Sequence, residues 1–237
     1  MCVNFRPPEP EMLEAVMGVI IDLHDTGFWK EETWKDYAAP IVRRGAHGGR
    51  EGVLASYGMV PRQRIPAGVK PYDTMNARAE TVGQLRSFSG AWKQAQLCLV
   101  PMRAFYEPCY ESGKAVRWGI GMADQAMFAV AGLWREWESD DGTQISFTQL
   151  TINADAHPLM RRFHFLGDER RPPDEKRGLV IVPPAEWDDW LNCTNPEYAR
   201  SFLQPYPAEQ MSAWPAPVPK KEKPVQPKAP SDNLELF

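Results

Sequence analysis

The sequence predicts an α+β fold made mainly of antiparallel strands, and three observations lead to this class. Between residues 38 and 182, short apolar or alternating runs are separated by groups of Gly, Pro, Asn and Asp, the pattern of strands and turns. Apolar residues at helical spacing occur only in stretches outside or between these runs. The composition, 43% hydrophobic and 24% charged over 237 residues, is that of a globular protein with a sizeable core.

The first quarter of the chain predicts a helix followed by a hairpin. Residues 11–25 place apolar side chains at helical spacing, and Gly27 follows them. Residues 40–42 and 53–60 predict two strands, joined by the Gly-rich turn 43–50. This turn holds three Arg and one His, so it is either a solvated hairpin tip or a loop that contacts phosphate.

The rest of the predicted domain alternates strands with two further helices. A helix is expected over residues 80–92, with Val82, Leu85 and Phe88 facing inward, and another from residue 183 onward. Strands are expected at residues 97–101, 115–120, 126–134, 145–152 and 179–182. The consecutive strands between residues 115 and 134 predict a β-meander.

Two parts of unequal size are expected: a domain over residues 1–204 and a tail over residues 205–237. Residues 215–230 consist largely of Pro and Lys with almost no large apolar side chain, so they cannot bury enough surface to offset the entropy of ordering. We therefore expect a disordered, extended tether. It ends at residues 232–237 in the sequence Asp-Asn-Leu-Glu-Leu-Phe, a candidate docking peptide.

Composition and cysteine spacing exclude several classes of protein. The four cysteines, at positions 2, 98, 109 and 193, form no C-x-x-C pair and no zinc-like spacing, which favours a reducing compartment. No apolar run reaches the length of about 18 residues that a membrane span requires, and no signal-peptide core follows the first residues. We expect a cytoplasmic, soluble monomer without a metal or an organic cofactor. The net charge of −4 leaves room for a local basic groove.

The first two residues, Met1 and Cys2, indicate a specific chemistry. A cytosolic aminopeptidase normally removes Met1 when a small residue follows, which leaves Cys2 with a free amine and a thiol. Their ordinary pKa values are about 8 and about 8.5, so both groups are partly deprotonated near neutral pH. The amine condenses with an aldehyde to an imine, and the thiolate then closes a thiazolidine ring. Such a residue traps aldehydes, although Cys also occurs at position 2 by chance.

Further motifs add up to a resemblance to a known family. Cys2, the string Asn-Ala-Arg-Ala-Glu-Thr at residues 76–81, Phe-Tyr-Glu at residues 105–107 and a late His-bearing loop before the strand at 179–182 resemble the SRAP family. These are the SOS response-associated peptidases, also called abasic site processing proteins. The match extends from Cys2 to about Leu191. The resemblance implies a barrel-like, mainly β fold that holds single-stranded DNA and captures abasic sites covalently through Cys2.

The resemblance also implies roles for particular side chains. Glu107 is the candidate acid and base for the proton transfers, with a pKa raised by partial burial. Asn76 orients the amine or the adduct through hydrogen bonds. A histidine assists at the sugar hydroxyl. His164 fits the family pattern when residues 165–175 are an insertion, whereas His157 follows the preceding strand more closely. We prefer His164 and keep His157 as the alternative.

Contacts with the DNA backbone are expected from arginines, because guanidinium groups bind phosphates bidentately without reading sequence. Arg78 lies beside Asn76 in the motif, and weaker candidates are Arg161, Arg162, Arg62 and Arg64. The chain departs from the family pattern at residues 3–4, where Val-Asn replaces the usual Gly-Arg. This departure puts a phosphate contact from position 4 in doubt.

The last residues resemble a different short motif. Leu234, Leu236 and Phe237 are similar to the Leu-x-Leu-Phe peptides by which bacterial repair proteins bind the sliding clamp. On a flexible tether, such a peptide would raise the effective concentration of the domain near DNA.

The sequence leaves three functions in competition. The first is a protein of the DNA damage (SOS) response that crosslinks itself to abasic sites in single-stranded DNA, with possible lyase activity. The second is a peptidase that uses Cys2 as its nucleophile and removes its own Met1. The third is a non-covalent binding module for single-stranded nucleic acid. The string at residues 76–81 favours the first, which requires an exposed Cys2 beside Glu107 and a histidine.

Overall fold

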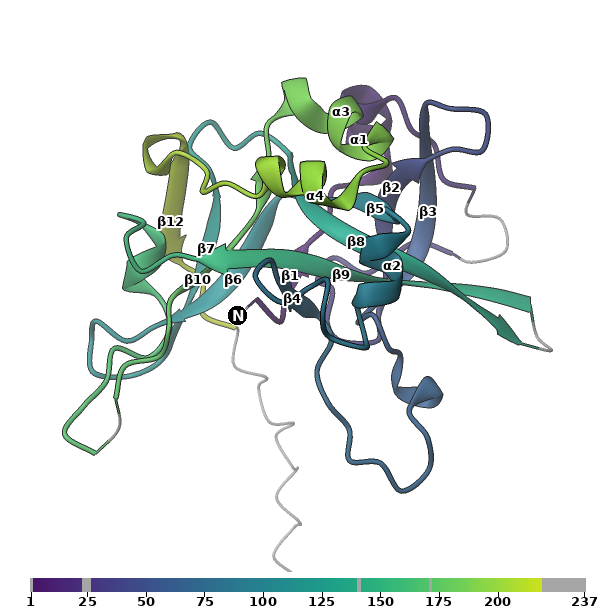
Figure 1. The fold of residues 1–237 in the computed structure, drawn as a ribbon. Helices are drawn as coiled ribbons and strands as arrows, with labels where there is room; N and C mark the ends of the chain where they lie inside the picture. Colours follow the sequence, from purple (N-terminus) through teal and green to yellow (C-terminus); the bar gives the residue numbers. More distant parts are fainter. Residues whose placement is uncertain (1, 23–26, 140–141, 171, 219–237) are drawn as a thin grey trace, which may run out of the picture.

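The computed structural model describes residues 2–22, 27–139, 142–170 and 172–218 and consists of two β-sheets with short helices around them (Figure 1). The antiparallel four-stranded sheet has, in spatial order, β1 (Phe5–Arg6), β6 (Ala104–Cys109), β7 (Val116–Met122) and β12 (Met211–Pro215). The eight-stranded sheet has, in spatial order, β10 (Arg177–Leu179), β9 (Gly142–Asn153), β3 (Arg50–Tyr57), β2 (Ala38–Arg44), β5 (Leu97–Met102), β8 (Phe128–Ser139) and β11 (Ile181–Val182), and β4 (Asn76–Arg78) pairs with β9.

The larger sheet closes into a barrel because β9 pairs with β8 as well as with β3. The five strands of this barrel are β9, β3, β2, β5 and β8. All strand pairs are antiparallel except β3 with β9 and β4 with β9. The predicted fold class, mainly antiparallel and barrel-like, is therefore confirmed.

Strand β5 shows why the apolar run at residues 97–101 folds as a strand. Successive side chains of a strand point to opposite faces, so a strand buried on both faces is apolar throughout. Leu97 and Leu99 belong to one core cluster, which also contains Trp190 of α3, whereas Cys98 and Val100 belong to a second. The second cluster packs residues of the four-stranded sheet against the barrel strands, and it includes Cys2.

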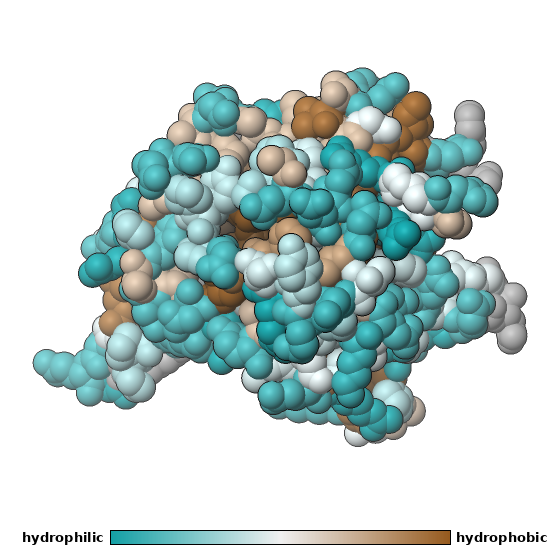
Figure 2. Space-filling model, turned by 45° about the horizontal axis from the view of Figure 1, so that its top comes forward, coloured by the Kyte–Doolittle hydropathy of each residue, from teal (hydrophilic) through white to brown (hydrophobic). Residues whose placement is uncertain are grey.

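The described helices are short and are α1 (Pro10–Met17), α2 (Ser89–Lys93), α3 (Trp187–Asn192) and α4 (Pro196–Ala199). Helices α1, α3 and α4 lie on the same side of the barrel (Figure 1). Figure 2 shows this side brought forward: its surface is largely hydrophilic, and apolar side chains appear in small groups. None of the helices in the described ranges is long and apolar enough to cross a membrane.

The helix predicted over residues 11–25 is shorter than expected. It ends at Met17 because Gly18 takes a left-handed conformation, with φ of 67°, and its N–H donates to the carbonyl of Glu14. Val19 then packs against the backbone of Gly52 on β3, where no side chain would fit. Residues 23–26 lie outside the described part. The expected helical continuation is therefore wrong from residue 18 to residue 22.

The helix predicted over residues 80–92 is mostly a series of turns, and only α2 is a regular helix. Glycines at positions 83 and 90 lower the helix propensity of this stretch. Val82 and Phe88 are buried as expected, but Leu85 is 49% exposed, so its predicted inward position is wrong.

The segment after residue 204 belongs in part to the fold. Strand β12 pairs with β7 over five residues, and Trp214 lies against Gly119. The domain therefore continues beyond the predicted boundary at residue 205, at least to residue 215. Most of the predicted tether and the whole docking peptide, with Leu234, Leu236 and Phe237, fall in residues 219–237, outside the described residues.

Candidate active site

Backbone pairing brings the N-terminal segment alongside β6. Phe5 pairs with Phe105, and the N–H of Tyr106 donates to the carbonyl of Asn4 at 3.1 Å. The ring of Phe5 packs edge-on against Tyr57 of β3, with centroids 5.3 Å apart. These contacts fix the start of the chain next to the Tyr106–Glu107 part of β6.

Two side chains hold the carbonyl of Cys2. The Asn76 Nδ2 donates to it at 2.6 Å and the Tyr57 hydroxyl donates to it at 3.0 Å. Asn76 lies on β4, which pairs with β9 through the register Asn76 to Gln149. The Oδ1 atom of Asn76 is buried and accepts no hydrogen bond from the described residues. The amide therefore has an acceptor that no described residue engages, and an acceptor of this kind can bind an amine or a hydroxyl.

The thiol of Cys2 is buried, contrary to the exposed cysteine that we expected. The residue is 1% exposed, and its Sγ donates to the carbonyl of Asn4 at 3.3 Å. Burial and, to a smaller extent, the negative charge of Glu107 together raise the pKa of the thiol to about 12. The thiol packs as an apolar group in the second core cluster, which explains its position. The contribution from Glu107 places the carboxyl and the thiol in one electrostatic environment.

Glu107 and His164 form a buried pair next to Cys2. The His164 Nδ1 lies 3.6 Å from the Glu107 Oε2, and the two side chains are 3% and 7% exposed. Burial raises the pKa of Glu107 to about 7 and lowers the pKa of His164 to about 4. Both shifts favour the neutral forms, so between about pH 4 and pH 7 this is a neutral acid beside a neutral imidazole rather than an ion pair.

The backbone of His164 is held in an unusual conformation. Its φ is 64°, its N–H donates to the carbonyl of Pro108 at 2.9 Å, and the preceding Phe163 forms a β-bridge with Cys109. The ring Nε2 lies 3.2 Å from the carbonyl of Arg177. Because a carbonyl only accepts, Nε2 is assigned the proton, and the lone pair of Nδ1 then faces Glu107.

His157, the alternative histidine, lies in a different setting. Its Nδ1 accepts hydrogen bonds from the backbone N–H groups of Leu159 and Met160, and its Nε2 lies 2.8 Å from the carbonyl of Tyr206. Both ring nitrogens are thus used to hold loops together. The structure brings Glu107 together with His164 and not with His157.

Most of the chain matches a known protein family. Residues 27–220 match the family model described as SOS response associated peptidase (SRAP). The chain belongs to the SRAP family. This result confirms the family that the motifs predicted.

Curated SRAP relatives are known from Bacillus subtilis (strain 168). The abasic site processing protein YoqW is 31% identical over 146 residues, which cover 60% of this chain and 59% of that protein. The abasic site processing protein YoaM is 30% identical over the same shares of both chains. This chain thus matches less than two thirds of the length of these relatives.

Solved structures extend the likeness over nearly the whole chain. A Bordetella bronchiseptica crystal structure is 33% identical, with a TM-score of 0.78, and the match covers 92% of this chain and 100% of that chain. A Bacteroides thetaiotaomicron structure is 19% identical, with a TM-score of 0.70 and coverage of 90% and 91%. The second likeness shows the fold alone.

The arginines that the sequence suggested as DNA contacts have different surroundings in this SRAP protein. Arg78 is half-exposed and pairs with Glu175 at 2.9 Å. Arg162 binds Glu111 through two hydrogen bonds of 2.8 and 3.0 Å. Arg62 and Arg161 are exposed, and Arg64 lines a separate cavity.

One buried residue that the sequence did not suggest, Arg177, lies next to the candidate active site and contacts His164. Its guanidinium is 3% exposed and binds the carboxylates of Glu80 and Glu175 and the carbonyl of Thr151. Its own carbonyl faces His164. The sequence feature that could have indicated Arg177 is Glu80, which belongs to the motif at residues 76–81. A partly buried carboxylate needs a cationic partner, and Arg177 is that partner. Among the described residues no cluster of His, Cys, Asp or Glu is suited to a metal ion.

Asn4, which stands where the family usually has Arg, has a structural role in this protein. It is 2% exposed, its Nδ2 donates to Glu32 and to the carbonyl of Thr33, and its Oδ1 accepts from Arg117 at 2.7 Å. Arg117 also binds Glu32 at 2.6 Å and stacks on Tyr106, 3.4 Å from the ring centroid. Asn4 thus joins the N-terminal segment to β7.

We expect Asn4→Ala to lower the free energy of unfolding by about 2 kcal/mol, because buried partners lose hydrogen bonds. Asn4→Arg should cost more, since it places a second cation beside Arg117 in a buried site. Urea unfolding of both variants measures these losses, with Val3→Ala, at a 44% exposed position, as the control. Equal stability of Asn4→Arg and the parent would contradict this role.

Proposed function

We propose that this SRAP protein captures abasic sites in DNA by a covalent bond to Cys2 after Met1 has been removed. The observation that supports it best is the arrangement around residue 2: Asn76 holds its carbonyl, and a buried Glu107–His164 pair adjoins its thiol. The names of the Bacillus relatives, abasic site processing proteins, point to the same substrate.

The chemistry proceeds in three balanced steps. The amine of Cys2 adds to the aldehyde carbon of the ring-opened sugar, and a proton moves from nitrogen to oxygen to give a carbinolamine. Loss of the hydroxyl with a proton, as water, gives the imine. Because Cys2 is 1% exposed in this structure, the N-terminal segment has to shift to uncover its sulfur before the last step. The sulfur then forms a bond to the imine carbon, and the thiol proton ends on the nitrogen. The product is a thiazolidine, and the sum is protein plus aldehyde minus one water.

Glu107 is suited to the proton transfers in these steps. With a pKa of about 7 it is neutral in about half of the molecules near neutral pH, so it can donate a proton to the leaving hydroxyl and accept one from the thiol. The thiol needs such a base because, with a pKa of about 12, it does not ionise by itself at neutral pH. The Oδ1 of Asn76 accepts no hydrogen bond from the described residues and is proposed to orient the amine.

His164 is proposed to act at the sugar hydroxyl as a neutral base. Its pKa of about 4 leaves the imidazole uncharged at neutral pH, so it can accept a proton during ring opening. The strained backbone that presents it is typical of functional positions.

A denaturing gel tests the proposed function directly. Uracil-containing single-stranded DNA, treated with uracil glycosylase, is incubated with the purified protein and heated. We expect a shifted, heat-stable band with this DNA and none with the same strand before glycosylase treatment. Cleavage of a peptide substrate without any such band would support the peptidase alternative instead. We favour capture because the Bacillus relatives are named abasic site processing proteins.

The two histidines should differ in this assay. We expect His164→Ala to slow crosslinking by roughly tenfold to a hundredfold, in line with the loss of one acid–base group. His157→Ala should lower the melting temperature and leave the crosslinking rate of the folded protein within about twofold of the parent. The single-turnover rate, measured below the melting temperature of each variant, decides between them. A slower rate in His157→Ala alone would reverse the assignment.

A further inference from the structure

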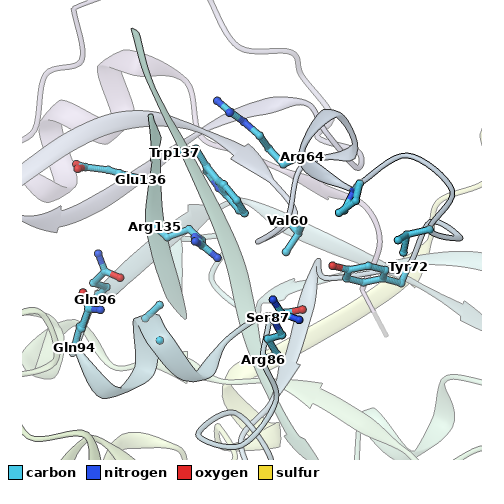
Figure 3. A pocket seen from close by; sticks show the side chains of 14 residues that line it. Val60, Arg64, Tyr72, Arg86, Ser87, Gln94, Gln96, Arg135, Glu136 and Trp137 are labelled. Carbon is cyan, nitrogen blue, oxygen red and sulfur yellow. The ribbon is translucent and has the colours of Figure 1, made fainter. Parts of the chain in front are cut away.

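A large cavity lies apart from the candidate active site. Its volume is about 910 Å³, within the range of sites that hold small organic ligands. Three parts of the chain line it: the loop between β3 and β4, the segment that leads into and out of α2, and the outer end of β8 (Figure 3). The polar and aromatic side chains around it are Arg64, Tyr72, Arg86, Ser87, Gln94, Gln96, Arg135, Glu136 and Trp137.

The cavity has an excess of positive charge. It contains three arginines and one acidic side chain, Glu136, whose carboxylate is already bound by Arg43 at 3.0 Å. Within the described ranges, no carboxylate pairs with Arg86 or Arg135. The Nε of Arg64 is buried and has no hydrogen-bond partner there either. Guanidinium groups left in this state favour an anionic ligand.

Arg135 and Trp137 form a flat surface beside these charges. The guanidinium carbon of Arg135 lies 3.8 Å from the centroid of the Trp137 ring, and both residues are half-buried. Partial burial lowers the pKa of Arg135, so its charge is poorly solvated. The ring of Tyr72 lies on the opposite side of the cavity (Figure 3). Aromatic and guanidinium planes stack with nucleobases regardless of their sequence.

The cavity is connected to the candidate active site through β4. The loop that contributes Arg64 and Tyr72 ends at Asn76, which holds Cys2, and the segment that leaves β4 contributes Arg86 and Ser87. In addition, Trp137 donates to Ser146, which donates to the carbonyl of Met59 in the same loop. The cavity and Cys2 are thus connected through adjoining segments of the chain and the hydrogen bonds between them.

We infer that this cavity is a second subsite for the DNA strand, which holds a nucleotide on one side of the abasic site. Arg64, Arg86 and Arg135 bind its phosphates, and the stacked Arg135–Trp137 surface packs against its base. This inference rests on the proposed function for the identity of the strand. The subsite implies that the protein binds the DNA more tightly on one side of the abasic site than on the other.

Equilibrium binding without capture tests the subsite independently of the covalent step. The full chain with Cys2→Ser is titrated with a fluorescent single strand of about 15 nucleotides that has no abasic site. We expect the added pair Arg86→Gln and Arg135→Gln to weaken binding by about tenfold or more. The slope of log K against log salt should become shallower by about 1.4, or 0.7 for each lost phosphate contact. Arg103→Gln, which removes a cation paired with Glu9 outside the cavity, serves as the control. An affinity within twofold of the parent and an unchanged slope would overturn the inference.

A second experiment first measures capture by the unsubstituted protein, a comparison that does not depend on the folding of a variant. Abasic oligonucleotides extended only on the 5′ side or only on the 3′ side of the lesion are compared in the gel assay. One of them should be captured at a lower concentration, and the Arg86→Gln, Arg135→Gln protein should lose that preference. Equal capture of both strands would contradict the subsite. Absence of any crosslink would contradict the proposed function, while the binding result would still decide on the cavity.

Discussion

Cys2→Ser is expected to abolish the heat-stable crosslink to abasic DNA completely. Serine retains the amine and still forms an imine, but an imine hydrolyses on heating, and the hydroxyl is too weak an acid and nucleophile to close the ring. The buried setting should tolerate the change in size, since the thiol donates only one hydrogen bond, to the carbonyl of Asn4.

Two additions make the Cys2→Ser result decisive. Borohydride, which reduces imines to stable amines, should restore a permanent adduct in Cys2→Ser and so show that the amine still reacts. The matched control is Cys193→Ser, which replaces another buried free cysteine and should leave the crosslink unchanged. A heat-stable band in untreated Cys2→Ser would mean that another residue is the nucleophile.

Glu107→Gln is expected to lower the crosslinking rate by about a hundredfold, the usual contribution of one general acid–base group. The unsubstituted protein should show a bell-shaped pH profile. Its rate falls at low pH because the amine, with an ordinary pKa of about 8, becomes protonated. It falls at high pH because Glu107, with a pKa of about 7, loses the proton that it donates. Glu107→Gln should lack the descent at high pH. A variant with the full rate and an unchanged profile would remove Glu107 from the mechanism.

The same substitution should change stability in a pH-dependent way. Burial raises the pKa of Glu107 from 4.5 to about 7, so the fold prefers the neutral carboxyl. The stability that this preference gives is fully present below pH 4.5 and is lost as the pH rises through 7. The difference amounts to about 3 kcal/mol at pH 8. Urea unfolding should therefore show Glu107→Gln more stable than the parent at pH 8 but not at pH 4.5. An equal effect at both values would contradict the raised pKa.

The raised pKa of Glu107 lowers the stability of the fold at neutral pH but suits the proposed proton transfers. A neutral or apolar residue in place of Glu107 would avoid the cost of ionisation at neutral pH. The raised pKa is also what makes the group able to donate and accept protons near pH 7. The stability measurements and the rate measurements on Glu107→Gln should consequently change in opposite directions.

Much of the fold could be predicted from local patterns. The apolar run at β5 indicated a strand buried on both faces, and the turn at residues 43–50 indicated the hairpin of β2 and β3. The helix over residues 11–25 was overestimated because Gly18 ends it in a conformation that apolar spacing does not reveal. Strand β12 was not predicted because the prolines around it are typical of a linker. Its pairing with β7 is a contact between residues far apart in the sequence, which local patterns do not reveal.

The sequence could suggest which residues belong to the candidate site, but not how they are arranged in space. The motif residues Cys2, Asn76 and Glu107 come together only because β1 pairs with β6 and β4 pairs with β9. Spacing alone could not separate His164 from His157, because both lie in an irregular segment whose path is set by contacts such as the Phe163–Cys109 bridge. Nor could it show that the thiol of Cys2 is buried, since burial depends on the packing of both sheets.

The intact mass of the purified protein, before and after incubation with an abasic oligonucleotide, tests the capture chemistry most directly. We predict a starting mass without Met1, then a single product heavier by the oligonucleotide minus one water, with the link mapped to Cys2. A protein that retains Met1, gains no mass, or is joined to DNA through another residue would contradict it.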